Sequence, residues 1–154
     1  MNDRKSKSVW LAVATCLVAA LVGCGDPKLH PISGRVTLDG KPYERLLVYM
    51  RPMERDATKF NIGVGETDSR GQLTLRSTAG DGLEQGLYRV SFSCMVSSKA
   101  GQEVLSGSEK HDDDRTLVTE EKVPEPYSSD IDSPEVFEVK ANANNYYQFD
   151  IPNR

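Results

Sequence analysis

Few side chains of this chain could act as nucleophiles or metal ligands, since its 154 residues include three cysteines and two histidines. The densest group is His111 followed by Asp112, Asp113 and Asp114. Imidazole and carboxylate groups together suit several divalent metal ions. Adjacent side chains of an extended or mobile segment point in different directions, however, and a run of charges is usually a solvated surface. These four residues are weak candidates for a metal site, and we assign no metal or other cofactor.

The sequence does not supply the residues of a hydrolytic or phosphate-binding site. A serine nucleophile needs a neighbouring base and an oxyanion hole, and neither His30 nor His111 lies beside a nucleophile-elbow motif. We expect His30, which precedes Pro31, to cap the first strand. The glycines stand at turns and strand ends without a following helix, so no helix N-terminus can hold an anion. We therefore expect a protein that is not an enzyme.

The N-terminus has the pattern of an export signal. Arg4, Lys5 and Lys7 make its first residues mostly positive, and residues 9–22 form an uncharged run of fourteen. A membrane-spanning helix needs about 20 apolar residues, so this run is too short to cross a bilayer comfortably. A short apolar run that ends in a small residue is typical of a signal peptide that is cleaved after export.

The signal ends in Leu21, Val22, Gly23 and Cys24, which resemble the lipobox of bacterial lipoproteins. The resemblance implies that diacylglycerol is attached to the Cys24 thiol, that the chain is cleaved just before it, and that the new amino terminus is acylated. Two or three acyl chains would hold the protein firmly, since each buried methylene contributes about 0.8 kcal/mol. The alternatives are an uncleaved anchor and an ordinary secretory signal in which Cys24 is incidental.

The lipobox predicts a signal peptide over residues 1–23 and a lipidated cysteine with a short tether over 24–31. The predicted location is the cell envelope, with the protein anchored to a membrane by lipid and facing the periplasm or the exterior. Cleavage removes three basic residues and one acidic residue, so the formal net charge changes from −4 to −6. Such an acidic domain is a poor partner for nucleic acid. Cys94 is the one thiol left, and we expect it to be a small core residue.

The remaining chain of about 130 residues has the size of one domain and almost no helical periodicity. Short apolar or alternating runs are separated by turn signals such as Asp39-Gly40 every eight to twelve residues, which is typical of a β-sandwich. We predict seven strands, over residues 32–38, 46–50, 62–67, 73–75, 87–96, 136–139 and 146–151.

Alternation within these runs predicts which side chains face the core. In the longest run the inward set is Tyr88, Val90, Phe92, Cys94 and Val96. In the last run, Tyr147, Phe149 and Ile151 share a face, so Tyr146 should point outward.

Several short motifs in sequence order resemble small exported bacterial proteins with a carboxypeptidase regulatory-like, or transthyretin-like, domain. They are HPISGRVTLDGKPYE, LLVYMRP, GETDSRGQLTL, DGLEQGLYRVSF and FEVKANANNYYQFDI, and they cover residues 30 to 151. This family has a first strand that opens with G-x-V-x-x-x-G, a second strand often written V-x-F-x-P, a T-D-x-x-G-x-F turn and strand, a G-x-Y-x-V strand and an F-D-L ending. The resemblance implies an all-β, seven-strand immunoglobulin-like (transthyretin-like) sandwich over residues 32–151.

Residues 97–134 are polar and charged, and we expect them to form a long insertion outside the sandwich. A structureless connection longer than about 15 residues is unusual in a compact domain and is normally functional or disordered. Residues 116–118 are a short stretch that could extend the neighbouring strand pair. The rest of the segment is expected to be mobile.

Two functions remain open for such a protein. The first is a non-enzymatic structural or protein-interaction module of the envelope, whose partner is another envelope protein bound through a strand edge or the insertion. The alternative is a carbohydrate- or peptide-binding module, for which an exposed ring of the Tyr146–Tyr147 pair would offer a stacking surface. Fold class alone does not decide between them.

Overall fold

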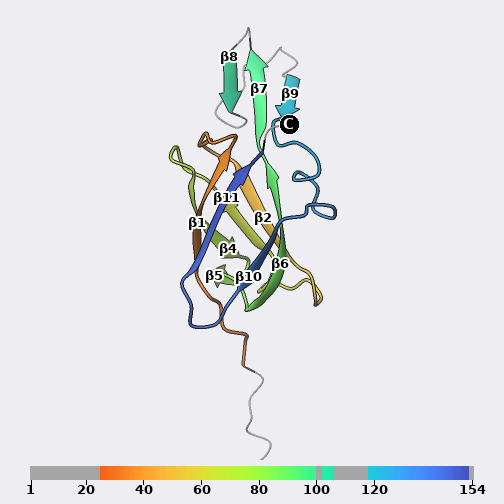
Figure 1. Ribbon diagram of the computed structural model, residues 1–154. Coiled ribbons are helices and arrows are strands. Elements are labelled where there is room, and N and C mark those ends of the chain that lie inside the picture. Colours follow the sequence, from red (N-terminus) through yellow and green to blue (C-terminus); the bar gives the residue numbers. More distant parts are fainter. Residues whose placement is uncertain (1–24, 100–101, 106–117, 153–154) are drawn as a thin grey trace, which may run out of the picture.

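The computed structural model describes residues 25–99, 102–105 and 118–152 of the chain (Figure 1). Within these ranges there are eleven β-strands and no helix. The strands are β1 (Ile32–Leu38), β2 (Leu47–Pro52), β3 (Gly63–Glu66), β4 (Gln72–Ser77), β5 (Gly80–Asp81), β6 (Gly86–Ser93), β7 (Met95–Lys99), β8 (Gln102–Leu105), β9 (Val118–Glu121), β10 (Val136–Val139) and β11 (Asn145–Ile151). The prediction of an all-β fold is confirmed.

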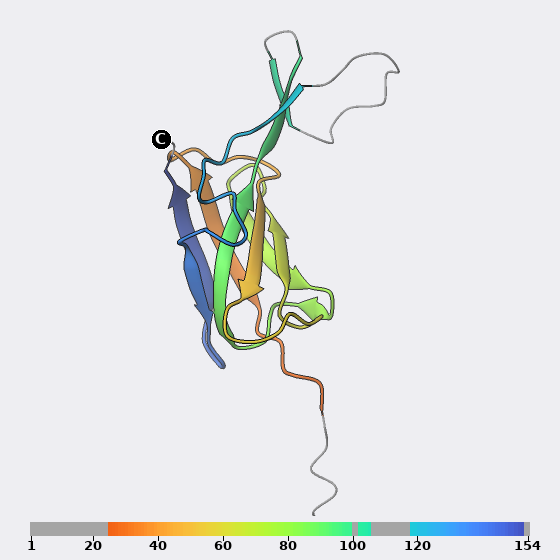
Figure 2. The ribbon, with the colours of Figure 1, turned by 90° about the vertical axis from the view of Figure 1, so that its right-hand side faces the viewer.

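Most of the strands wrap around one core as a sandwich that is nearly a barrel (Figures 1 and 2). The strand order is β10-β6-β2-β3-β4-β1-β11, with β5 paired to β4. Strand β4 joins the two layers, because its end at Arg76 and Ser77 pairs with β3 while its start pairs with β1. The pairing of β1 with β11 is parallel, and the other pairs are antiparallel.

All seven predicted strands occur, and the bounds of the first and of the strand at 136–139 are as predicted. The second, fourth and last differ by one or two residues at one or both ends, the third is shorter than expected, and the longest is divided at Cys94 into β6 and β7. The turn after β1 has positive φ at Asp39 and Gly40, as the sequence predicts. The immunoglobulin-like or transthyretin-like character of the sandwich stays a prediction.

The core contains the side chains that alternation predicts. Tyr88, Val90, Phe92, Cys94 and Val96 are all buried, with at most 3% of each residue exposed. The inward face of the last strand is also confirmed in part, since Tyr147 and Ile151 are buried and Phe149 is half-buried. Period-two alternation therefore predicts these faces correctly because one side of each strand lies against the opposite layer.

Aromatic rings fill the space between β10 and β11, the two ends of the strand order. Phe149 stacks on Phe92 with ring centroids 5.5 Å apart, and it also contacts Tyr127 and Tyr147. Phe137 meets Tyr147 edge-on at 5.2 Å. Such ring pairs add about 0.5–1.5 kcal/mol each beyond the burial of their area. Side-chain packing thus closes the sandwich where no strand pairing of β10 with β11 is seen among the described residues.

Part of the segment 97–134 forms regular structure outside the main sheet, and its assignment as an insertion stays a prediction. Strand β7 continues the longest strand and pairs on its two sides with β8 and β9, which gives a three-stranded sheet of order β8-β7-β9. Val118, part of the stretch expected to extend a strand pair, begins β9. Residues 100–101 and 106–117 lie outside the described residues, so the expected mobility of that part stays a prediction.

Residues 122–135, which precede β10, run along the edge of β6 where β10 does not reach. The Phe92 amide donates to the Tyr127 carbonyl at 3.0 Å, and the Val90 amide donates to the Glu135 carbonyl at 2.9 Å. Ser133 is fully buried, and its hydroxyl donates to the Val90 carbonyl. A buried strand edge needs partners for its backbone groups. This irregular segment supplies them, although its polar composition indicates a solvated loop.

Candidate functional site

The chain enters the sandwich at one pole of the molecule (Figure 1). Residues 25–29 have no regular structure, and His30 then forms an antiparallel bridge with Leu83. The His30 amide donates to the Leu83 carbonyl at 2.7 Å, and the Leu83 amide donates back at 3.1 Å. His30 therefore fixes the start of the first strand through its backbone. Cys24, the predicted lipidation site, lies outside the described residues.

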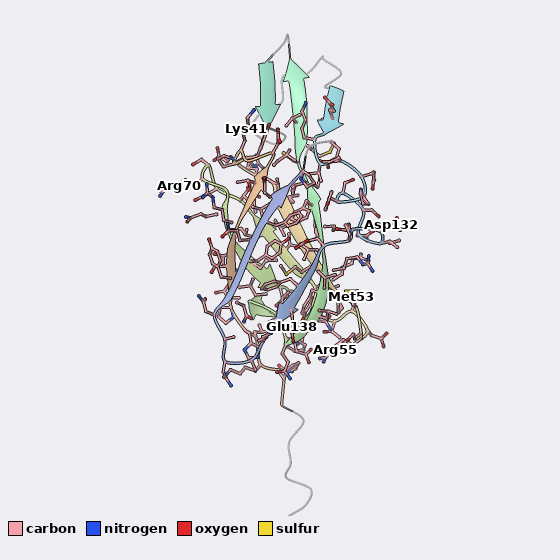
Figure 3. The ribbon with its side chains drawn as sticks, viewed as in Figure 1. Lys41, Met53, Arg55, Arg70, Asp132 and Glu138 are labelled. Carbon is pink, nitrogen blue, oxygen red and sulfur yellow. The ribbon has the colours of Figure 1, made fainter. Side chains whose placement is uncertain are left out.

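The three-stranded sheet of β7, β8 and β9 projects from the opposite pole (Figures 1 and 2). Met53 and Arg55 lie toward the end where the chain enters, whereas Lys41 and Arg70 lie toward the end that carries this sheet (Figure 3). Strands β8 and β9 form its two edges, and in the described part of the chain neither pairs with a second strand. Such edges expose a row of backbone donors and acceptors that another extended segment can pair with.

Glu121 fastens this sheet to the sandwich at the break between β6 and β7. Its carboxylate accepts hydrogen bonds from the Ser93 hydroxyl at 2.7 Å, the Cys94 amide at 2.7 Å and the Val123 amide at 2.9 Å. The Lys122 amide donates to the Cys94 carbonyl at 3.0 Å. Hydrogen bonds to an ionised group are about twice as strong as neutral ones. Glu121 therefore orients the projecting sheet relative to the body of the protein.

The other residues considered from the sequence take structural positions or cannot be placed. Cys94 is buried, as predicted for a small core residue. His111, Asp112, Asp113 and Asp114 lie outside the described residues. No group of three or more potential metal ligands occurs within the described ranges. The same ranges contain no helix that is long and apolar enough to cross a membrane.

The Tyr146–Tyr147 pair divides as predicted, with one ring outside and one inside. Tyr146 is 48% exposed, and Tyr147 is 3% exposed. The Tyr147 hydroxyl donates to Glu135 Oε1 at 3.3 Å. Burial raises the pKa of Glu135 above its ordinary value, and burial together with the nearby Glu135 carboxyl raises the pKa of Tyr147. The hydrogen-bonded pair of Tyr147 and Glu135 belongs to the packed interior between β10 and β11.

Sequence reasoning does not identify two residues that shape the two poles. Glu121 belongs to the charged segment expected to be an insertion, yet its three hydrogen bonds define the base of the projecting sheet. Asn145 is buried, and its side chain exchanges two hydrogen bonds with the backbone of Lys140, at 2.9 and 3.1 Å. A polar residue directly before an alternating strand was the available signal for Asn145. Nothing in the local sequence distinguishes Glu121 from the neighbouring acidic residues.

No family model matches this sequence, and the comparison with curated proteins gives no match. Among solved structures, a 9R-lipoxygenase from Cyanothece PCC8801 is similar over 90% of this chain, with 10% sequence identity and a TM-score of 0.33. The chain spans 19% of the length of that protein. So distant a likeness carries no argument about fold or activity, and membership of the family that the sequence resembles stays a prediction.

Proposed function

We propose that the protein is a lipid-anchored, non-enzymatic module of the bacterial cell envelope that binds another envelope protein. The observation that carries the proposal is the arrangement of its two poles. The chain enters the sandwich at one pole, and from the other projects a sheet whose two edge strands have no second partner among the described residues (Figure 1). If Cys24 carries lipid, the membrane lies at the first pole and the projecting sheet faces away from it.

The reach of the tether supports this orientation. Residues 25–29 separate Cys24 from the His30 bridge, and five extended residues at about 3.3–3.6 Å each span roughly 17 Å. The entry pole would therefore stay close to the lipid headgroups. The β7–β9 sheet would then be the part of the described structure most accessible to a partner.

Strand addition is the binding mode that this sheet favours. An extended segment of a partner can pair with a free strand edge through main-chain hydrogen bonds. Glu121 holds the base of the sheet in place, so the sheet loses less conformational entropy when a partner binds. Glu120 and Thr119 are exposed on β9, which keeps that edge polar.

Site-specific cross-linking in membranes tests the proposal. A photoreactive amino acid at Thr119 in β9 should give a discrete cross-linked protein, whereas the same probe at Lys140, near the entry pole, should not. Glu103→Pro and Val104→Pro change adjacent residues of β8. Because backbone amides alternate in direction along a strand, one of these prolines removes an outward donor and the other a donor to β7.

The expected result is that at least one proline variant loses the cross-linked partner or binds it much more weakly, while its thermal unfolding midpoint matches that of the parent. Equal cross-linking from Thr119 and Lys140, or unchanged yields in both proline variants, would contradict binding through the projecting sheet.

A further inference from the structure

Strand β3 packs closely on leucine side chains of the core through its two inward glycines. A Cβ atom on Gly63 would stand 2.9 Å from Leu83 Cδ1, and one on Gly65 would stand 2.9 Å from Leu73 Cδ1. Real Cβ atoms do not approach so closely, so a larger residue at either position would require these methyl groups to move. On the outward side of β3, Val64 is exposed and borders a depression.

The strand register places a row of outward side chains across this depression. Ser91 of β6 pairs with Tyr49 of β2, and Tyr49 pairs with Val64 of β3. In the adjacent row, Arg89 pairs with Arg51. Because successive residues of a strand alternate between faces, Tyr49 and its cross-strand neighbours point away from the buried Met50 and Phe92. The ring of Tyr49 therefore lies between the hydroxyl group of Ser91 on one side and the aliphatic side chain of Val64 on the other.

The segment that follows β9 gives this depression a side wall. Ser128, Ser129 and Asp130 border a hollow of about 440 Å³ whose floor includes Tyr49 and Ser91. Sites for small ligands typically measure about 300–1,000 Å³. A second hollow of about 750 Å³ shares Val64 with the first and extends to Tyr146. Both hollows are bordered by Val64 of β3, and we call the two together the groove.

The two charged residues that line the first hollow, Arg51 and Asp130, form an ion pair with Nη1 and Oδ2 3.0 Å apart. Around the second hollow, Arg45 pairs with Glu66 at 3.3 Å and Arg76 pairs with Asp81 at 2.7 Å, whereas the Asp68 carboxylate accepts hydrogen bonds from the backbone amides of Arg70 and Gln72. Paired charges give no strong net field, so the first hollow favours neither an anion nor a cation. A ligand that matches it is neutral, has apolar faces and carries many hydroxyl groups.

Polar groups that could bind such a ligand converge on the ring of Tyr49. Ser91 is 4% exposed and lines the first hollow. The Tyr49 ring is half-buried beside it. Arg51 and Asp130 at the rim offer a donor and an acceptor to neighbouring ligand hydroxyls.

We propose that this groove binds a neutral oligosaccharide, with one sugar ring stacked on Tyr49 and its hydroxyls bonded by Ser91 and the Arg51–Asp130 pair. An extended peptide fits less well, because a sheet face has no unpaired backbone groups for strand addition. This site lies on a face of the sandwich, whereas the proposed protein partner binds the edges of the β7–β9 sheet. One residue of its lining, Ser93, also donates a hydrogen bond to Glu121 at the base of that sheet.

Calorimetric titration of the full chain tests the site. The protein is held in micelles of an amine-oxide detergent, which has no sugar headgroup, and is titrated with soluble linear gluco-, xylo- and chito-oligosaccharides. We expect at least one series to bind. Tyr49→Ala should weaken binding by about tenfold or more, and Ser91→Ala by about fivefold, which are the losses expected for a stacking contact and a hydrogen bond.

Matched variants separate binding from folding. Ser69→Ala changes an exposed serine outside the groove and should leave the dissociation constant unchanged. Tyr49→Leu keeps apolar volume without the ring, so it should stay folded and still bind poorly. The site is refuted if no series binds the parent, or if both Tyr49 variants bind as tightly as the parent. Neither result affects cross-linking from Thr119, so the two proposals fail separately.

Discussion

Replacing Glu121 should loosen the projecting sheet without unfolding the sandwich. The carboxylate accepts three hydrogen bonds, two of them from the backbone amides of Cys94 and Val123. In Glu121→Ala these amides lose their acceptor. Each unsatisfied buried donor costs about 1–3 kcal/mol, and the lower part of this range applies because Glu121 is half-buried and water can reach the site. The total for two amides is about 3 kcal/mol.

Hydrogen exchange measured residue by residue is the appropriate assay, since local opening is separated there from global unfolding. A loss of about 3 kcal/mol corresponds to roughly 100-fold faster exchange of the Cys94 and Val123 amides when local opening governs exchange. The amides of β2, at the centre of the main sheet, should exchange as in the parent. Glu121→Gln keeps an acceptor for the amides but loses its charge, so its effect should be intermediate.

Unchanged protection at both amides in Glu121→Ala would refute the assigned role of this carboxylate. Equal loss of protection at β2 would also contradict it, because the residue would then support the whole sandwich rather than the base of the sheet. Glu120→Ala, at the exposed neighbouring acidic residue, is the control and should leave protection unchanged.

Three further results are expected. Phe92→Ala should lower the free energy of unfolding by about 3–5 kcal/mol in urea titrations, because Phe92 is 1% exposed and stacks on Phe149. Tyr146→Ala is the exposed control. Equal unfolding midpoints for Phe92→Ala and the parent protein would disprove the assigned strand face. Gly34→Ala should cost about 3 kcal/mol, because its Cβ would lie 2.2 Å from the Tyr147 carbonyl oxygen, whereas Gly25→Ala meets no atom within 4 Å and should be neutral. Burial raises the pKa of Tyr88 from 10.0 to about 12, so the stability that the neutral phenol contributes below pH 10 should be lost as the pH rises toward 12. Tyr88→Phe should make that loss smaller. Identical dependence of the unfolding free energy on pH in Tyr88→Phe and the parent protein would contradict this.

Alternation along single strands could be predicted from the sequence because it depends on local periodicity alone. Tyr88, Val90 and Phe92 were assigned to the core correctly, and so was the division of Tyr146 from Tyr147. The parallel pairing of β1 with β11 joins residues more than a hundred positions apart, and no local pattern encodes it.

The segment after β9 could not be predicted for a different physical reason. Its contact with β6 rests on backbone groups of Tyr127 and Glu135 and on the buried hydroxyl of Ser133. Hydrogen bonds of this kind depend on position and not on side-chain polarity, so a polar composition indicates a loop even where the chain is packed. The wall of the proposed saccharide groove, at Ser128 to Asp130, was hidden from sequence reasoning for the same reason.

The two glycines of β3 do not by themselves predict how that strand packs. Gly63 and Gly65 lie inward on β3, where side chains from the opposite layer occupy the space of their missing Cβ atoms. The sequence alone interprets Gly65 as a residue of a turn or strand end. The close packing of β3 on leucine side chains is a property of the assembled sandwich, and no local pattern encodes it.

The mass of the protein extracted from bacterial membranes tests the lipid anchor most directly. Intact mass spectrometry and analysis of the N-terminal peptide should give a chain that begins at Cys24 and carries diacylglycerol on its thiol and an acyl chain on its amino group. The Cys24→Ala variant should carry no lipid and keep its signal sequence. A parent chain with an unmodified Cys24, or a Cys24→Ala variant that still incorporates labelled fatty acid, would contradict the anchor and with it the proposed orientation of the two poles.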